Sequence, residues 1–385
     1  MNIHDFDDIR PFLPDELPAV YDRLLADPEF RTVLAYVYKD VPQEQIEQLM
    51  RSSKTNLEFQ LNMVYPMLKN LIAQAATSLT ANFSALDSEP DLAHTFISNH
   101  RDIVLDSALL SYVLAENGKN TVEIAIGDNL LIRPWIRDLV RINKSFIVQR
   151  SLTMRQMLLA SAHMSRYMHF CITEKHENIW IAQSEGRAKD SNDRTQDSVL
   201  KMMAMGGNLR QLNIVPLAIT YEYDPCDYLK AEEFQNKRDV PEFKKSQQDD
   251  LDNMRTGIFG PKGKIHYHAA PSINTWLDTL PADLPKSDYF RMVAEHIDQE
   301  IHRHYHLYPG NYVAADMLLD MREGDDTHPH HEDHYTVEQR KQFVDYLYRK
   351  IGMVRLVHPD KDYLTERMLT MYANPVFNHE KAQEK

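Results

Sequence analysis

Short apolar runs that alternate with longer helical patterns are the feature that most constrains how this chain folds. From about Leu92 onward there are six such runs: AHTFIS, TVEIAI, SFIV, NIWIAQ, IVPLAITY and KIHYHAA. Runs of this length are typical of buried strands. Helical patterns such as LTMRQMLLASAHMSRYMHF separate most of them. Strands that alternate with helices predict an α/β domain with a mixed, largely parallel sheet flanked by helices.

The residues before this domain favour helices. Segments such as YDRLLADPEFRTVLAYVY, QEQIEQLM and LNMVYPMLKNLIAQAATSL space apolar residues three and four apart, which is the helical period. No internal repeat is present. We therefore expect a helical N-terminal region over residues 1–88, the α/β domain over 89–275, and a C-terminal helical extension over 276–385 that packs on the same domain.

Composition indicates a globular protein of a reducing compartment. The 385 residues are 43% hydrophobic and 26% charged, as in folded domains large enough to bury a core. Cys171 and Cys226 are the two cysteines, without a CxxC spacing, which argues against a disulfide framework. The acidic start MNIHDFDDIR lacks a signal-type apolar run, and no stretch approaches 18 apolar residues. We expect a cytoplasmic protein.

Charge is unevenly distributed along the chain. The formal net charge is −14, yet residues 129–170 contain seven Lys and Arg residues against Asp138 alone. An acidic protein repels the phosphate backbone, so we expect no nucleic-acid partner. A basic segment within it indicates one specific anionic ligand or surface.

Polar clusters occur where predicted strands meet the following helices. His100 follows AHTFIS directly, with Asp102 and Asp106 close behind it. A carboxylate that holds one imidazole nitrogen leaves the other free to take a proton from a hydroxyl, so this pattern is typical of a general base. Neither separation puts a pair on one helix face, so His100 should lie in the turn before the helix.

Three further clusters supply candidate ligand-binding residues. The predicted strand SFIV is followed closely by a cation, and the strand NIWIAQ precedes the charged segment SEGRAKD. The strand IVPLAITY contains a proline and ends at a Tyr-Glu pair. Glycine allows close approach of a ligand, and the cations suit a phosphate. The candidates are Arg150, Glu185, Gly186, Arg187, Lys189, Pro216, Tyr221 and Glu222.

Taken in order over residues 92–233, the four clusters resemble the motifs of the glycerol-phosphate acyltransferase family. This family includes glycerol-3-phosphate and 1-acylglycerol-3-phosphate acyltransferases. The first cluster is similar to the His-x4-Asp motif, but Asp106 lies six positions after His100, so one residue is extra. The second cluster has one arginine where the family has a pair, and the third lacks one residue.

The resemblance implies a reaction and roles. His100 would deprotonate the acceptor hydroxyl as it attacks an acyl thioester, oriented by Asp106 or by Asp102, with Asp106 favoured because LLSYVL aligns behind it. Arg150, Arg187 and Lys189 would neutralise the acceptor phosphate. Glu185 would position the acceptor or those cations, and Tyr221 with Glu222 would shape the site.

The resemblance also implies an acyl donor and an acceptor. The acyl donor would be acyl-CoA or acyl carrier protein, with no metal and no other cofactor. The acceptor would be glycerol-3-phosphate or 1-acylglycerol-3-phosphate, in phospholipid biosynthesis. Alternatives are another lipid alcohol or a non-catalytic lipid-binding protein of the same fold.

Two features of the sequence bear on membranes and metals. Lipid products imply peripheral contact with the inner face of the cytoplasmic membrane, and the segment LLIRPWIR (residues 130–137) combines the apolar, Trp and Arg side chains of an interfacial surface. The histidine-rich segments, with His302, His304 and His306 and then His328, His330, His331 and His334, keep a metal-dependent hydrolase as a less favoured alternative.

Overall fold

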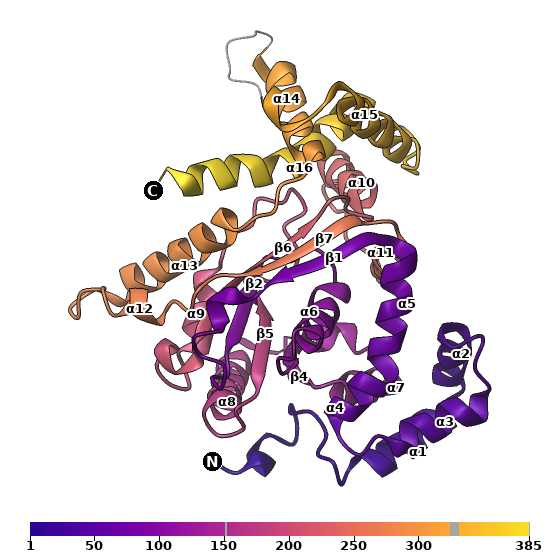
Figure 1. The fold of residues 1–385 in the computed structure, drawn as a ribbon, viewed down its shortest axis with the longest axis vertical. Coiled ribbons are helices and arrows are strands. Elements are labelled where there is room, and N and C mark those ends of the chain that lie inside the picture. The colour runs from indigo at the N-terminus through magenta and orange to yellow at the C-terminus, as the bar shows by residue number, and fades with distance from the viewer. Residues whose placement is uncertain (151, 324–330, 385) are drawn as a thin grey trace.

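A seven-stranded mixed sheet forms the centre of the protein (Figure 1). The computed structural model describes residues 1–150, 152–323 and 331–384. The strand order is β1-β7-β6-β2-β5-β3-β4, and every neighbouring pair is parallel except β6 with β7. This confirms the predicted fold class. The strands are β1 (Ala76–Asn82), β2 (Thr95–Ser98), β3 (Val122–Gly127), β4 (Ser145–Val148), β5 (Asn178–Ala182), β6 (Ile214–Tyr221) and β7 (Gly263–Ala269).

Helices cover both faces of the sheet because successive strand residues point to opposite sides. In β2, Phe96 joins a core cluster with Leu109 of α6 (Leu105–Glu116) and Leu68 of α5 (Tyr65–Ala75). The next residue, Ile97, joins a second cluster on the other face with Met168 of α8 (Met154–Thr173). Helices α7 (Pro134–Ile142) and α9 (Asp197–Met203) complete the crossover connections. The central strands are therefore buried on both sides.

The N-terminal region is helical over most of its length but ends in a strand. It contains α1 (Leu17–Ala26), α2 (Pro28–Val37), α3 (Gln43–Ser52), α4 (Asn56–Phe59) and a π-helical turn (Gln60–Val64) before α5. The helical interpretation of LIAQAATSL was wrong for its second half. The chain becomes extended at Ala76, and β1 pairs with β7, with Leu79 opposite Ile265. The free edge of β7 supplies the hydrogen bonds that favour a strand there, and a local periodicity cannot report such a distant partner.

In the C-terminal part of the chain, the long final helix packs against other helices, and the helix over residues 286–303 packs against β6. This part comprises α10 (Asp227–Asp239), α11 (Gln247–Phe259), α12 (Asn274–Leu277), α13 (Lys286–Arg303), α14 (Pro309–Glu323), α15 (Val337–Ile351) and α16 (Lys361–Gln383). Figure 1 shows α16 running beneath α14 and α15 and toward α13. Tyr346 and Tyr372 both donate to the buried Asp227 carboxylate, at 2.5 and 2.8 Å. These bonds tie α15 and α16 to the start of α10.

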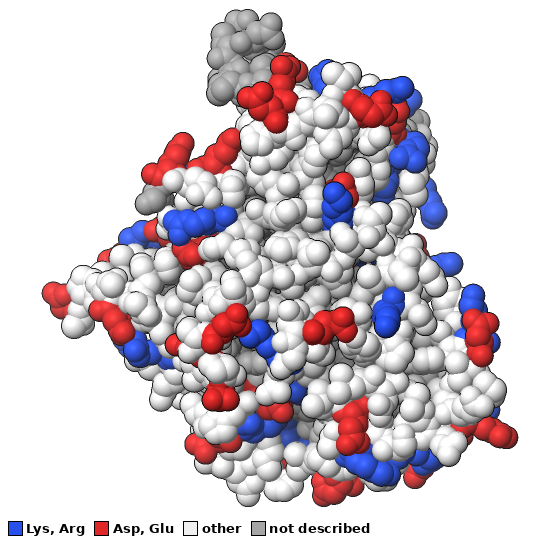
Figure 2. Space-filling view, in the orientation of Figure 1, with Lys and Arg blue, Asp and Glu red and all other residues white. Residues whose placement is uncertain are grey.

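Acidic and basic side chains are interspersed over the face shown in Figure 2, without a large area of either sign. Within the described residues, no helix is both long and apolar enough to cross a membrane.

Four histidines join β7 to the segment that follows α13. The rings of His268 and His304 lie 4.3 Å apart between centroids, and those of His266 and His306 lie 5.0 Å apart. Burial, with a smaller contribution from the neighbouring imidazoles, lowers the pKa of both His266 and His268 to about 4. His266 and His268 therefore pack best when they are neutral.

This cluster predicts a loss of stability in mild acid. The folded-state pKa of His266 and His268 lies below the ordinary value of 6.5, so the unfolded chain binds protons first as the pH falls. The stabilisation is present above pH 6.5 and is lost progressively toward pH 4. We expect the urea midpoint to fall between pH 7.5 and pH 5, and to fall less in a His266→Gln, His268→Gln variant. An equal fall in the variant would show that the cluster does not contribute.

Candidate active site

His100 lies in the turn between the carboxyl end of β2 and the start of α6, as the sequence predicts. Its Nδ1 is 2.8 Å from Oδ2 of Asp106. A carboxylate only accepts hydrogen bonds, so Nδ1 carries the hydrogen and Nε2 is the basic nitrogen. The side chain is 14% exposed, and its ring lies edge-on to Trp180 at 5.7 Å. Among the described residues, no group bonds Nε2, so this nitrogen is available to a substrate.

Asp106 is held as a fixed anion by four donors. Its Oδ2 accepts from His100 and from the backbone N–H groups of Arg101 and Asp102, at 2.6 and 3.0 Å. Its Oδ1 accepts from the Tyr221 hydroxyl at 3.2 Å. Burial raises the pKa of Tyr221, which keeps that hydroxyl protonated. The first turn of a helix also favours a negative charge. Asp106 can therefore orient the imidazole and stabilise its protonated form.

Asp102 has a different local function. Its Oδ1 accepts from the backbone N–H groups of Val104 and Leu105, at 2.8 and 2.7 Å, and so caps the start of α6. Burial and the neighbouring Asp106 charge raise the pKa of Asp102, and Arg187 offsets part of that rise. Of the two candidate orienters, only Asp106 contacts His100. The extra residue of the motif is accommodated in the turn between His100 and α6.

Asn99 and Tyr267 fix the ends of this turn. The side chain of Asn99 pairs with the backbone of Ile219, donating to its carbonyl and accepting from its N–H, both at 2.8 Å. This bond pair continues the contact between β2 and β6 beyond Ser98. Tyr267 of β7 donates to the backbone carbonyl of Asp106 at 2.9 Å. Asn99 follows the end of β2 and Tyr267 lies within β7, but the roles of both residues depend on pairings that sequence spacing does not reveal.

The segment after β5 brings one predicted cation near the first motif. β5 is the direct neighbour of β2 in the sheet. Arg187 follows it, is half-buried, and influences the pKa of both Asp102 and Asp224. Its guanidinium donates to the neutral Asn253 side chain at 3.3 Å. Among the residues that the structure describes, no carboxylate forms a direct ion pair with Arg187.

The other two predicted cations are placed differently. Lys189 forms an ion pair with Glu233 of α10. Arg150 is exposed after β4, and β4 lies three positions from β2 in the sheet. Its backbone N–H donates to Asp128 at 3.2 Å. The structure therefore does not bring Arg150 beside His100.

Three further candidates lie in the strand-end segments. Glu185 is exposed, and its N–H donates to Gln196 at 3.0 Å. Gly186 has a φ of +79°, a conformation that glycine adopts without strain. Glu222 accepts from the backbone N–H of Lys264 at 2.9 Å, on the β7 side of β6.

Pro216 lies inside β6, between β2 and β7, rather than at the strand edge or bulge that proline favours. Its carbonyl accepts from Ala270 at 2.9 Å, and the register of β6 with β7 begins at the next residue, Leu217. Proline has no N–H, so its carbonyl alone bonds Ala270 at this position. The residue belongs to the sheet and is buried.

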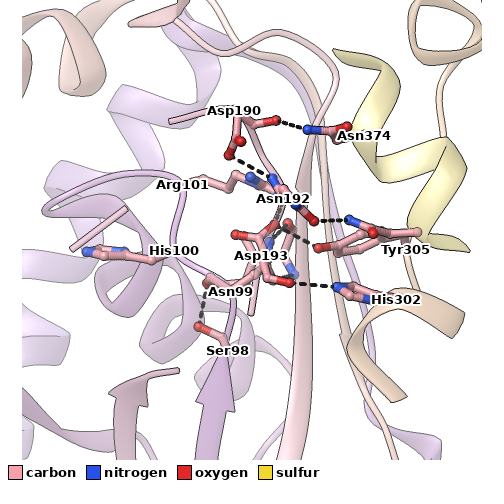
Figure 3. Close-up of polar contacts among 12 residues, drawn as sticks. Ser98, Asn99, His100, Arg101, Asp190, Asn192, Asp193, His302, Tyr305 and Asn374 are labelled. Carbon is pink, nitrogen blue, oxygen red and sulfur yellow. Dashed lines mark hydrogen bonds and ion pairs between the residues drawn. The ribbon is translucent and has the colours of Figure 1, made fainter. Parts of the chain in front are cut away.

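A buried ion pair next to His100 was missed by the sequence analysis. Arg101, which follows His100, pairs with Asp193 in the segment after β5, and both are buried. Tyr305 donates to Asp193 at 2.8 Å, and a His302 ring nitrogen lies 3.1 Å from the Asp193 backbone carbonyl. Figure 3 shows this group, with His100 pointing away from it. Arg101 stands next to His100 in the first motif, but no pattern in the sequence around Asp193 or Tyr305 indicates that these residues contact it.

The histidine-rich segments serve packing in the described part of the chain. His302 contacts Asp193, and the two ring nitrogens of His331 lie against Asp316 and Glu380, at 2.5 and 2.8 Å. His328 and His330 lie outside the described residues. Within those residues, no group of three His, Cys, Asp or Glu side chains is arranged to hold a metal ion.

Comparison with known families identifies the class of this domain. Residues 90–220 match the family model described as acyltransferase. This segment is therefore an acyltransferase domain, and it contains His100, Asp106 and Arg187. The chain is also similar to a solved structure, the 1-acyl-sn-glycerophosphate (LPA) acyltransferase PlsC from Thermotoga maritima. That similarity has 8% identity and a TM-score of 0.35, and covers 74% of this chain and 97% of the other. No curated protein matches the sequence.

Proposed function

We propose that this protein transfers a fatty acyl group from acyl-CoA or acyl carrier protein to a hydroxyl of glycerol-3-phosphate or 1-acylglycerol-3-phosphate. The observation that carries the proposal is the 2.8 Å contact between His100 Nδ1 and an Asp106 carboxylate held by three further donors. Both residues lie within residues 90–220, which match the acyltransferase family model. The reaction so written needs no metal.

The chemistry follows from the state of the imidazole. Nε2 of His100 takes the proton of the acceptor hydroxyl while its oxygen attacks the thioester carbonyl. The C–S bond breaks, an ester forms, and the proton passes from Nε2 to the departing thiolate. Asp106 stabilises the imidazolium between these steps. General-base assistance of this kind contributes about 10²–10⁴-fold to the rate.

Arg187 is the cation best placed for the acceptor phosphate. It lies on the segment after β5, beside the strand that precedes His100. Its described side-chain hydrogen bond is to the neutral Asn253, and no carboxylate in the described part of the chain pairs with it directly. Lys189 shares its charge with Glu233. Planar guanidinium groups bind phosphate oxygens in pairs, which also favours arginine.

Acyl transfer by the purified full chain tests the proposal. Both donors are combined with both acceptors, in the presence of vesicles that hold the lipid acceptor. We expect transfer to one glycerol-phosphate acceptor, and a raised KM for it in Arg187→Gln with a smaller change in Arg150→Gln. The preferred pair identifies donor and acceptor. No transfer with any pair would contradict the proposal and favour another lipid alcohol or a non-catalytic lipid-binding role.

A further inference from the structure

The first turns of α8 expose apolar side chains that most helices bury. Met154 is 88% exposed, Leu158 61%, Leu159 63% and Met157 45%. Burial of α8 against the sheet begins only at Met164. On a helix, Met154, Met157 and Leu158 fall on one side, with Leu159 further round. We call these four residues the α8 tip. Adjacent exposed apolar side chains usually mark a contact surface.

The α8 tip lies at the same edge of the sheet as His100. α8 follows β4 and leads into β5, and both strands are parallel to β2 through the shared pairings of β3 and β5. Its first turn therefore stands at the carboxyl edge, where His100 follows β2. β4 and β2 are three strand positions apart, or about 14 Å at roughly 4.8 Å a step.

A neighbouring loop extends this surface. The loop after β3 lies next to β4 because Gly127 pairs with Val148, and the N–H of Arg150 bonds Asp128 in it at 3.2 Å. It exposes Ile132, at 44%. Trp135, the aromatic residue of the predicted interfacial segment, instead packs its ring 5.8 Å from that of Phe30 and donates to Glu29 at 3.1 Å. The exposed apolar surface is therefore centred on the α8 tip, not on this tryptophan.

The charges around the tip are mainly positive. Arg155 is exposed between Met154 and Met157 in the sequence, and Arg150 is exposed just before α8 begins. Arg137 is exposed five residues after Ile132. Arg133, also exposed, lies 3.5 Å from Glu29. The whole chain carries a net charge of −14, so a cationic apolar surface here is a local exception. Apolar side chains among arginines suit an interface with anionic lipid headgroups.

We propose that the α8 tip, with Ile132, docks this protein onto an anionic lipid bilayer. Its apolar residues enter the acyl boundary, and Arg155 and Arg137 contact the headgroup phosphates. The projecting helix end favours a bilayer over a protein partner, because a bilayer accepts isolated side chains without a complementary groove. Docking turns the carboxyl edge of the sheet toward the membrane. The benefit for catalysis rests on the proposed function, whereas the docking itself does not.

Vesicle co-sedimentation of the full chain tests this surface without any acyl transfer. The vesicles are phosphatidylglycerol with phosphatidylethanolamine, or phosphatidylcholine alone. We expect binding to the anionic vesicles that weakens with salt, and at least a tenfold loss in a Met154→Ser, Leu158→Ser, Leu159→Ser variant. Arg155→Glu should lose the preference for anionic vesicles. The matched control is Val337→Ser, Val357→Ser, since both valines are 88% exposed elsewhere, and it should bind as the natural chain does.

Transfer to water-soluble glycerol-3-phosphate from a short-chain acyl-CoA, without vesicles, separates this idea from the proposed function. If that transfer occurs, the triple serine variant should retain it, because the tip is remote from His100. Equal vesicle binding by the triple variant and the natural chain, or no binding by the natural chain, would overturn the docking proposal. Loss of acyl carrier protein binding in the triple variant, with vesicle binding unchanged, would assign the surface to that protein instead.

Discussion

Replacing His100 by alanine should lower the rate of acyl transfer by about 10²–10⁴-fold and leave the fold intact. The side chain is 14% exposed and makes one hydrogen bond, to Asp106, so its removal disturbs little packing. No other described group occupies the position of Nε2. Steady-state rates with saturating donor, together with a urea unfolding curve, measure both parts of this expectation.

Asp106 and Asp102 provide a matched pair for the same experiment. Asp106→Asn places an NH₂ group or a weaker acceptor among four donors, so we expect a lower kcat and a changed pH profile. Asp102→Asn retains the oxygen that caps α6, so we expect a rate close to that of the natural protein. Equal losses in the two variants, or a His100→Ala variant with near-normal transfer, would refute this assignment of roles.

Asp193→Ala should destabilise the protein by about 3–5 kcal/mol, because removal of one partner leaves a buried charge without compensation. Burial lowers the pKa of Arg101, but the charge of Asp193 and nearby acidic groups outweighs that effect, so the guanidinium stays charged. Arg101 is 8% exposed. Once Asp193 is removed, water cannot fully solvate this cation.

Tyr305→Phe is the matched control for Asp193→Ala. It removes only the 2.8 Å bond to Asp193, and a loss of about 1 kcal/mol is expected. The double variant Arg101→Met, Asp193→Leu should recover much of the stability lost in Asp193→Ala, because it removes both charges. Urea unfolding of the four proteins gives the comparison. A loss below about 1 kcal/mol in Asp193→Ala would show that the cation finds other partners.

The sequence predicted those parts of the structure that local patterns determine. Each of the six apolar runs matches a strand to within two residues at either end, and each motif falls at or near a strand end, because a buried strand needs a continuous apolar run. β1 was missed because its partner, β7, is distant in sequence and the helical spacing of α5 runs into it. The spacing of apolar residues shows which face of a helix or strand is buried. It does not show which edge of the sheet still lacks a hydrogen-bonded strand.

The sequence indicated which residues are candidates for the site, but it did not show which of them contact one another. The spacing of His100, Asp102 and Asp106 left two orienters open, and the turn geometry decided between them. Lys189 was interpreted as a phosphate ligand, but a sequence cannot show that Glu233 lies beside it. Arg101 likewise gained its role from Asp193, which is 92 residues away.

The position of β1 has a consequence for how the protein forms during synthesis. The residue paired with Ala76 is Gly263, so β7 leaves the ribosome 187 residues after β1 does. At about 5–20 residues per second this delay is roughly 10–40 s. Throughout that time β1 has no strand to pair with, while β2 to β5 can already assemble. The residues of β1 are therefore made early and are among the last to reach their final place.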